Sequence, residues 1–199
     1  MAKINIRGLN AEISQKGYKV FKPLVEERVK KAFNKERQKL LNAFEGHEIT
    51  KEIEAGPNAT NSSNTLGGYG NLFTFIGFES GSDPISPIRS LLAKSIQIKT
   101  IRKKRNVLAL NLTFSVPTIE EIKAVAPMPW STDNWVEAVE RGISGLGQYM
   151  NSKNKGRSGG GIQVDVELTG QKMNSTPTEY MTKILEDMLK NIEANLKRL

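Results

Sequence analysis

The segment SIQIKTIRKKRNVLALNLTFSV, residues 95–116, decides the fold class of this chain. Apolar residues alternate with polar ones on both sides of a basic centre, RKKRN at residues 102–106. A period of two indicates strands with one buried face, and a short polar centre between two such runs is typical of a hairpin. The sequence therefore predicts an antiparallel pair over residues 95–101 and 107–116, joined by a basic tip.

Two long amphipathic helices flank this hairpin in the sequence. Apolar residues recur at spacings of three, four and seven over residues 19–44 and again over residues 178–199, which is the pattern of one helical face. We expect Gly46 to end the first helix as a left-handed residue, and residues 175–177, STP, to cap the second. The first helix carries a basic cluster in its middle: Lys30, Lys31, Lys35, Arg37 and Lys39.

Three shorter helices are expected around the hairpin. Residues 84–93 follow Asp83, whose side chain suits a helix N-cap. Thr118 followed by Glu121 has the spacing of a capping box and predicts a second start. A third helix is expected to begin at Asp133.

Five further segments complete the expected organisation. Residues 72–78, LFTFIGF, predict an apolar strand, and residues 48–55 fit either a short helix or an edge strand, with the alternation favouring the strand. Residues 56–70 are rich in Gly, Pro, Asn, Ser and Thr, which predicts a flexible loop that buries little surface. Residues 146–150 and 162–168 predict a second hairpin around a basic, glycine-rich tip.

The predicted fold class is α+β: an antiparallel β-sheet with protruding hairpins, flanked by a long N-terminal helix and a C-terminal helix. A chain of 199 residues is long enough for one sizeable core, so we expect a single domain over residues 1–199. Its parts are an arm and helix over 1–46, a sheet and hairpin region over 47–170 and the closing helix over 178–199.

The amino-acid composition of the chain argues against most familiar kinds of enzyme chemistry. The chain has no cysteine and one histidine, His47, so thiolate nucleophiles and zinc–thiolate sites have no ligands, and Ser/His/Asp hydrolysis would depend on a single residue. Glu52 and Glu54 can share a strand face, but beside Lys51 they suit a solvated edge better than acid–base chemistry. The glycine-rich stretches lack the spacing of a phosphate loop. We expect no enzyme activity, no cofactor and no bound metal.

The chain is moderately basic, with 29 Lys and Arg against 21 Asp and Glu and a formal net charge of +8. Two basic tips stand out: Arg102, Lys103, Lys104 and Arg105 in the first hairpin, and Lys153, Lys155 and Arg157 in the second. Three roles are open for such tips: phosphate contacts with nucleic acid, docking on an acidic protein, and solvated turns that prevent edge-to-edge aggregation. No base-reading motif accompanies them, so any nucleic-acid contact would be nonspecific.

No run approaches the roughly 20 consecutive apolar residues that cross a bilayer, and the N-terminus lacks a signal-peptide pattern. We therefore expect a soluble protein with no membrane partner.

Several stretches, taken in order, resemble the neck proteins of tailed bacteriophages, which are head-to-tail joining or tail-completion proteins. They are the basic helix over 19–44, the polar loop leading into LGGYGNLFTFIGF at 66–78, the two hairpins, ERGISGLG at 140–147 and the closing helix. The resemblance covers most of the chain and rests on layout and Gly/aromatic stretches, without a catalytic signature. This chain departs from the shortest members of that family in its length and its loop over 56–70.

The resemblance implies a structural role in the virion. Identical subunits would close into a ring, a hexamer or a dodecamer, between the connector on the portal side and the tail, around a channel for DNA. The implied partners are other copies of the chain, other neck, connector and tail-terminator proteins, and DNA bound nonspecifically. The implied locations are the virion neck and, during assembly, the host cytoplasm. The alternative is a nonspecific basic nucleic-acid-binding module.

Two surfaces carry the expected contacts of such a ring. The two basic tips would touch a neighbouring subunit, a partner or the channel. An apolar stripe on the closing helix, formed by Tyr180, Ile184, Met188 and Ile192, is expected to pack on the sheet or on a neighbouring subunit. Because residues 56–70 and 151–161 are expected to be flexible, their ordering would oppose self-association, and the ring would close only on a preformed partner surface.

Overall fold

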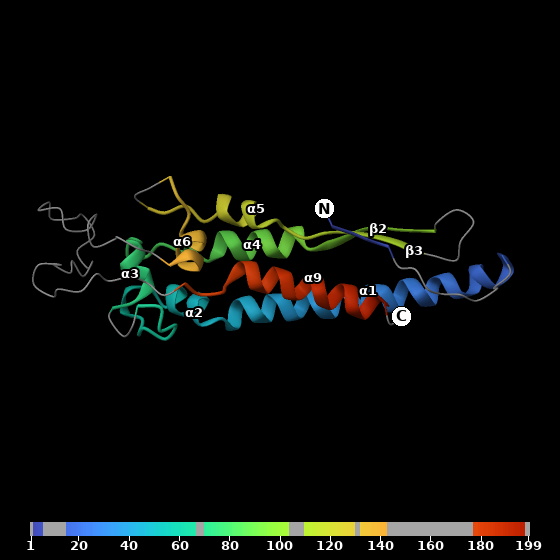
Figure 1. Ribbon diagram of the computed structural model, residues 1–199, viewed down its shortest axis with the longest axis horizontal. Helices are drawn as coiled ribbons and strands as arrows, with labels where there is room; N and C mark the ends of the chain where they lie inside the picture. Colours follow the sequence, from blue (N-terminus) through green and yellow to red (C-terminus); the bar gives the residue numbers. More distant parts are fainter. Residues whose placement is uncertain are drawn as a thin grey trace, which may run out of the picture. The chain divides into compact units, whose positions relative to one another are not determined.

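The computed structural model describes residues 2–5, 15–66, 70–103, 110–129, 132–142 and 177–197, and these form helices and an antiparallel sheet (Figure 1). The mixed fold class, the long N-terminal helix and the C-terminal helix are confirmed. The chain divides into two compact units. Unit 1 comprises Met1–Ala43, Leu91–Pro117 and Lys183–Leu199, and unit 2 comprises Phe44–Ser90 and Thr118–Thr182. The expected single domain stays a prediction.

The sheet of unit 1 has three described strands, β1 (Ala2–Asn5), β2 (Gln97–Lys103) and β3 (Leu110–Ser115). The order is β1-β3-β2 and both pairings are antiparallel, so β3 is the central strand. Ile98 of β2 pairs with Phe114 of β3, which confirms the predicted pairing of these two segments. The alternating N-terminal arm, for which no strand was predicted, forms the third strand.

Strand β2 is longer than predicted. It extends to Lys103, so Arg102 and Lys103 are strand residues, paired with Asn111 and Leu110, and their prediction as part of the turn is wrong. Long basic side chains suit an edge strand such as β2, because their charge opposes pairing with another chain. The rest of the predicted tip, including Lys104 and Arg105, lies outside the described residues.

The two long helices are α1 (Gln15–Gly46) and α9 (Met181–Lys197). Helix α1 begins earlier than residue 19 although Pro23 inside it removes one backbone hydrogen bond, and α9 begins later than residue 178. Gly46 ends α1 as predicted, but it does not have a positive φ, so the left-handed cap is wrong. The chain instead leaves α1 through His47, which is extended (φ −68°, ψ 136°) and starts the next helix.

Unit 1 buries the facing sides of α1, α9 and the sheet. The rings of Phe33 on α1 and Phe114 on β3 lie 5.5 Å apart, and Asn195 of α9 donates a hydrogen bond to Glu36 Oε1 of α1 at 3.0 Å. Figure 1 shows α9 running alongside α1. The other buried apolar side chains of unit 1 are Val29, Leu40, Leu92, Ile96, Ile184, Leu185, Met188 and Ile192. The entropy lost when these side chains are ordered is offset by the free energy gained when their apolar surface is removed from water.

Unit 2 is built from short helices around an aromatic cluster. The helices are α2 (Glu48–Glu54), the 3₁₀ helix η1 (Gly56–Asn58), α3 (Leu72–Ile76), α5 (Ile119–Ala124) and α6 (Trp135–Arg141). Helix α4 (Ser86–Ser95) begins in unit 2 and ends in unit 1. Ring contacts of 5.4 to 6.4 Å connect Phe73, Phe78, Trp135, Tyr180 and Phe44 in that order.

The predicted strand over residues 72–78 is wrong, because this segment contains helix α3. Asn71 Oδ1 accepts a hydrogen bond from Thr74 N at 3.0 Å and caps the N-terminus. Gly77 is left-handed (φ 89°), and its N–H reaches the carbonyls of Phe73 and Thr74. A polar cap at the N-terminus and a left-handed glycine at the C-terminus define one short helix, although the residues between them are mostly apolar.

The strand favoured for residues 48–55 is also wrong. His47 Nδ1 accepts a hydrogen bond from Ile49 N at 3.3 Å and caps helix α2. Ile49 and Ile53 are fully buried at a spacing of four, which a helix places on one face. The histidine cap explains why the alternation over 49, 51, 53 and 55 does not produce a strand.

The loop over residues 56–70 is ordered where it is described, against the prediction of a flexible segment. Asn71 Nδ2 donates to the carbonyls of Pro57 and Ala59 at 2.9 and 3.1 Å, and Thr65 and Leu66 are buried. Side chains from neighbouring elements therefore supply partners for the polar backbone of this loop. Residues 67–69 lie outside the described part.

The starts of the other short helices follow the predicted signals closely. Thr118 and Glu121 form the expected capping box of α5. Asp83 accepts from the backbone of Ile85 and Ser86, so its capping role is confirmed although α4 begins at Ser86. The cap of α6 is Asn134, one residue after the predicted one. The second hairpin falls outside the described residues.

Candidate functional site

Charge is distributed unequally between the two units. The segments of unit 1 hold 21 Lys and Arg and 7 Asp and Glu, a formal charge of +14, whereas those of unit 2 hold 8 and 14, a formal charge of −6. The net charge of +8 is therefore the sum of a basic unit and an acidic unit. A strong charge asymmetry within a chain points to a charged partner.

The described cations of unit 2 are neutralised locally. Each of these four side chains contacts at least one carboxylate: Lys51 contacts Glu48, Arg89 contacts Glu45 and Glu54, Lys123 contacts Glu120 and Glu137, and Arg141 contacts Glu137. Arg89 lies 2.6 Å from Glu45 and 2.7 Å from Glu54, and its hydrogen bond lowers the pKa of Glu45. Arg89 and Lys123 connect different elements of unit 2, whereas Lys51 and Arg141 pair within one helix.

Most of the described cations of unit 1 are not neutralised. Four of the described cations, Lys22, Lys39, Lys183 and Lys190, pair with a carboxylate on their own helix. Among the described residues, no carboxylate lies within 4.0 Å of six other cationic side chains: Arg28, Lys30, Lys31, Lys35, Lys94 and Lys99. All six are exposed. Unit 1 therefore presents positive charge that its own acidic residues do not compensate.

Four of the cations of unit 1 line one groove. It has a volume of about 650 Å³ and lies between α1, the last turn of α4 and β2. Lys30 and Arg37 come from α1, Lys94 from α4 and Lys99 from β2. The remaining lining residues are Glu26, Phe33, Asn34, Ala93, Ile96, Gln97 and Ile98. Its single carboxylate, Glu26, has Lys22 within 3.7 Å.

The two walls of the groove follow from the local structure. On α1 the lining residues lie at positions 26, 30, 33, 34 and 37, spacings of three and four that place them on one helical face. On β2 the lining residues are Gln97, Ile98 and Lys99, next to an irregularity between Ile98 and Thr100 that shifts the register of the strand pair. Phe33 and Ile96 are buried at the base, so the groove has an apolar floor and a basic rim.

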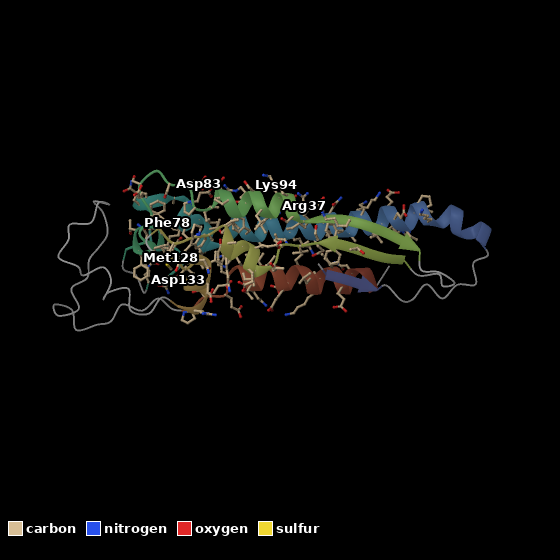
Figure 2. All side chains as sticks on the ribbon, turned by 90° about the horizontal axis from the view of Figure 1, so that it is seen from above. Arg37, Phe78, Asp83, Lys94, Met128 and Asp133 are labelled. Carbon is tan, nitrogen blue, oxygen red and sulfur yellow. The ribbon has the colours of Figure 1, made fainter. Side chains whose placement is uncertain are left out.

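Arg37 is held in this groove by a hydrogen bond to α4. Its Nη2 donates to the Ala93 carbonyl at 2.9 Å, and that carbonyl belongs to the last turn of α4, where the helix leaves carbonyls without intrahelical partners. The Nε atom of Arg37 is buried and has no hydrogen-bond partner among the described residues. Figure 2 labels Arg37 and Lys94, which come from these two helices. The guanidinium is thus held in place with one donor unsatisfied.

None of the residues predicted to make contacts is among the described residues that line this groove. Arg102 and Lys103 lie at the end of β2, and Lys104, Arg105, Lys153, Lys155 and Arg157 lie outside the described residues. Tyr180 is buried in unit 2, and Ile184, Met188 and Ile192 are buried in unit 1, so the chain itself covers the stripe.

Of the groove residues, Lys30 and Arg37 belong to the basic cluster noted in the sequence, whereas Lys94 and Lys99 were missed. The helical spacing of Lys30, Asn34 and Arg37 could have indicated a common face.

His47, the single histidine, has a structural role. It caps α2 through Nδ1, and its ring lies 4.8 Å from that of Tyr180. Burial lowers its pKa, against the opposing effects of a hydrogen bond with the Glu179 backbone and of the nearby Glu48. Tyr180 in turn shares a hydrogen bond with Thr50 at 2.7 Å, and burial raises the pKa of Tyr180. These side chains form a packed cluster that connects α2 to the start of α9.

Glu52 and Glu54 do not form the expected solvated edge. Glu52 is 1 % exposed, and its two oxygens accept backbone hydrogen bonds from Leu72 at 2.7 Å and from Ser63 at 2.8 Å. Glu54 instead pairs with Arg89. The expectation was wrong because α2 is a helix, which places Glu52 and Glu54 on different faces.

A second cavity, of about 420 Å³, lies in unit 2 and is lined by Phe78, Met128 and Trp135. Figure 2 labels Phe78 and Met128. Four prolines and the carboxylates of Glu79 and Asp83 also line it. The Nε1 of Trp135 is buried without a hydrogen-bond partner among the described residues. Asp83 already caps α4, so this cavity offers little polar chemistry.

The described residues contain no group of three or more His, Asp and Glu side chains placed to hold a metal ion. No helix among them is long and apolar enough to span a membrane.

Comparisons with protein-family models, with curated proteins and with solved structures found no match for this chain. Its relationship to any family therefore depends on the sequence resemblance alone.

Proposed function

We propose that this chain is a structural protein of the neck of a tailed bacteriophage. In this proposal, identical copies form a ring that joins the head connector to the tail and surrounds the DNA. The observation that carries the proposal is the separation of charge, +14 on the segments of unit 1 against −6 on those of unit 2. The layout described from the sequence supplies the family.

The charge separation suits a subunit that has DNA on one side and protein on the other. Double-stranded DNA carries about one negative charge per 1.7 Å of its axis, so a surface facing it gains from cations that are not already paired. Unit 1 offers such cations on α1, α4 and β2. The described cations of unit 2 are paired, and its segments have an excess of carboxylates, which suits contacts with a basic protein surface. A closed ring needs two different surfaces on each subunit, because its interfaces are heterologous.

The roles of the polar residues also favour a structural protein over an enzyme. His47, Glu52 and Arg89 are the described side chains most often found in chemical roles, and each is engaged in a cap, a loop anchor or an ion-pair cluster. In the second cavity the Ser82 hydroxyl donates to the Glu79 backbone carbonyl and the Asp83 carboxylate caps α4, so neither is arranged as a nucleophile with its base.

A second candidate, a nonspecific nucleic-acid-binding module, is favoured by the groove itself. Unpaired lysines on α1, α4 and β2 would attract a phosphate backbone whether or not the protein forms a ring. The two candidates differ in assembly, because the module needs no defined oligomer and no protein partner.

Assembly on a connector separates the two candidates. The full chain is measured by mass photometry and negative-stain imaging, alone and after mixing with connector particles purified from the same phage. We expect rings seated on the connector. Failure to bind the connector, together with salt-sensitive binding to any duplex DNA, would support the module and overturn the neck proposal.

A further inference from the structure

We propose that the groove between α1, the last turn of α4 and β2 is a binding site for the phosphodiester backbone of double-stranded DNA. Lys30, Lys94 and Lys99 would contact phosphates from the two walls, and Arg37 would contact one from the base. The inference rests on the proposed function, in which the ring surrounds DNA, and it identifies the surface of unit 1 that touches it.

The size of the groove favours an extended anion over a single small one. Lys30 and Arg37 are seven residues apart, about 10 Å along the axis of α1 at ~1.5 Å per residue. Lys94 and Lys99 line the facing side. A volume of about 650 Å³ corresponds to about twenty water molecules at ~30 Å³ each, much more than one phosphate group fills. Cations on two walls of a groove of this length match a chain of phosphates.

Arg37 supplies the most specific part of the site. One guanidinium nitrogen is fixed on the Ala93 carbonyl, so the plane of the group is held without a bound ligand. Its Nε is buried, so a phosphate in the groove would meet Arg37 through the part of the side chain that lines the groove and not through Nε. Arginine binds phosphate oxygens with several N–H donors in one plane. Holding the side chain in advance lowers the entropy lost on binding.

The surroundings favour nucleic acid over an acidic protein. Arg28, Lys31 and Lys35 of α1 are also exposed and uncompensated, but their positions place them on a different helical face from the residues that line the groove. Within the groove, cations on two walls match a regular polyanion, whereas an acidic protein carries isolated carboxylates. Glu26 is the one carboxylate in the lining, and Lys22 lies beside it at 3.7 Å. No base-reading motif accompanies the groove, so we expect equal affinity for unrelated DNA sequences.

The test compares two triple variants with the same change in charge. In the groove variant, Lys30→Gln, Lys94→Gln and Lys99→Gln are combined. In the control variant, Lys31→Gln, Lys51→Gln and Lys190→Gln are combined; these lysines are equally exposed and do not line the groove. Binding of two unrelated 30-base-pair duplexes to the full chain is followed by fluorescence anisotropy at several salt concentrations, and circular dichroism checks the fold of each variant.

We expect the groove variant to bind both duplexes about 10-fold or more weakly than wild type at 0.1 M salt. The slope of log affinity against log salt should fall by ~3, about one per lost phosphate contact, and by less than ~1 in the control variant. Arg37→Lys keeps the charge and removes the planar guanidinium, so it should weaken binding with a smaller change in slope. This variant also tests the site if the triple variant fails to fold.

Three results would overturn the inference. Equal losses in the groove and control variants would show that only net charge matters. Full displacement of DNA by about 5 mM inorganic phosphate would indicate a small-anion site. Equally tight, groove-dependent binding of polyglutamate with the same charge as the duplex would indicate an acidic protein partner.

Assembly is scored separately, so that this inference and the neck proposal fail independently. Normal seating of the groove variant on connector particles, combined with lost DNA affinity, supports both. DNA binding in the groove without any connector binding supports the groove and overturns the neck proposal.

Discussion

Glu52 shows how one charged side chain can determine a loop. Its carboxylate is buried and accepts the backbone N–H groups of Leu72 and Ser63, one at the start of α3 and one in the preceding loop. A carboxylate is the side chain that can accept both hydrogen bonds without placing a donor against either N–H. The conformation of residues 56–66 therefore depends on a residue in α2.

Replacing Glu52→Gln should destabilise the protein by about 2 to 3 kcal/mol, because one charge-assisted hydrogen bond is lost and an amide donor faces a backbone N–H. Urea denaturation followed by circular dichroism measures the change. The control is Glu48→Gln, in the same helix but exposed, which should change stability much less. Equal effects of the two substitutions would show that the loop does not depend on the buried carboxylate.

The environment of His47 predicts how stability depends on pH. Burial lowers the pKa of His47 below its ordinary value of 6.5, so the unfolded chain takes up this proton at higher pH than the folded chain does. The contribution of His47 to the free energy of unfolding is fully present above about pH 6.5. It is lost as the pH falls through that value towards the pKa of His47 in the folded chain. Tyr180, Glu48, Lys51 and the Glu179 backbone are the groups around it.

Denaturation curves at several pH values between about 5 and 7.5 should show the wild type losing stability as the pH falls. His47→Asn keeps a good helix cap and removes the titrating group, so its stability should vary less over the same range. A wild type and a variant with the same pH dependence would contradict this role for His47.

At the scale of single elements, the ends of the helices rely on different devices. Helix α3 ends at Gly77 with a φ of 89°, a conformation that costs about 1 to 2 kcal/mol for a residue with a side chain. Helix α1 ends at Gly46, which does not have a positive φ and has open space where a Cβ atom would lie. The two glycines therefore predict opposite outcomes.

Gly77→Ala should destabilise the protein by roughly 1 to 2 kcal/mol, whereas Gly46→Ala should stabilise it by roughly 0.4 to 1 kcal/mol by restricting the unfolded chain. Thermal and urea unfolding of the two variants are compared under the same conditions. A loss of stability in Gly46→Ala would mean that the transition from α1 to α2 needs the freedom of glycine.

The elements that could be predicted are those with local signals. Thr118 and Glu121 predict the start of α5, and the alternation over residues 95–116 predicts β2 and β3. The prediction failed at residues 72–78, where Asn71 and Gly77 define a helix inside an apolar run that was assigned to a strand. The same holds for α2, whose cap is a histidine and not one of the usual capping residues.

The groove could be predicted only in part. Lys30 and Arg37 stand out as members of a basic helix, but Lys94 and Lys99 are brought to them by the tertiary arrangement of α4 and β2. The Nε of Arg37 lacks a partner because of burial by distant segments, which no local pattern contains.

At the scale of the whole molecule, the two units share continuous helices. The boundaries between them fall inside α1, α4 and α9 and at Pro117–Thr118. A helix that unfolds in one unit loses hydrogen bonds at the boundary with the other. We therefore expect the two units to unfold together.

The positions of the tryptophans make this expectation measurable. Trp130 and Trp135 both belong to the segments of unit 2, whereas far-ultraviolet circular dichroism is dominated by the long helices α1 and α9. Urea transitions followed by tryptophan fluorescence and by circular dichroism should have the same midpoint. Separate midpoints would show that the units are independent despite their shared helices.

The discontinuous build of both units also has a consequence for synthesis on the ribosome. Unit 2 lacks a part until Thr182 has been added, and unit 1 lacks one until Lys183–Leu199 have emerged. At about 5 to 20 residues per second, the ~150 residues between the end of α1 and the end of α9 take at least ~8 seconds. During that interval the apolar face of α1 has no native cover from α9 and is open to non-native contacts.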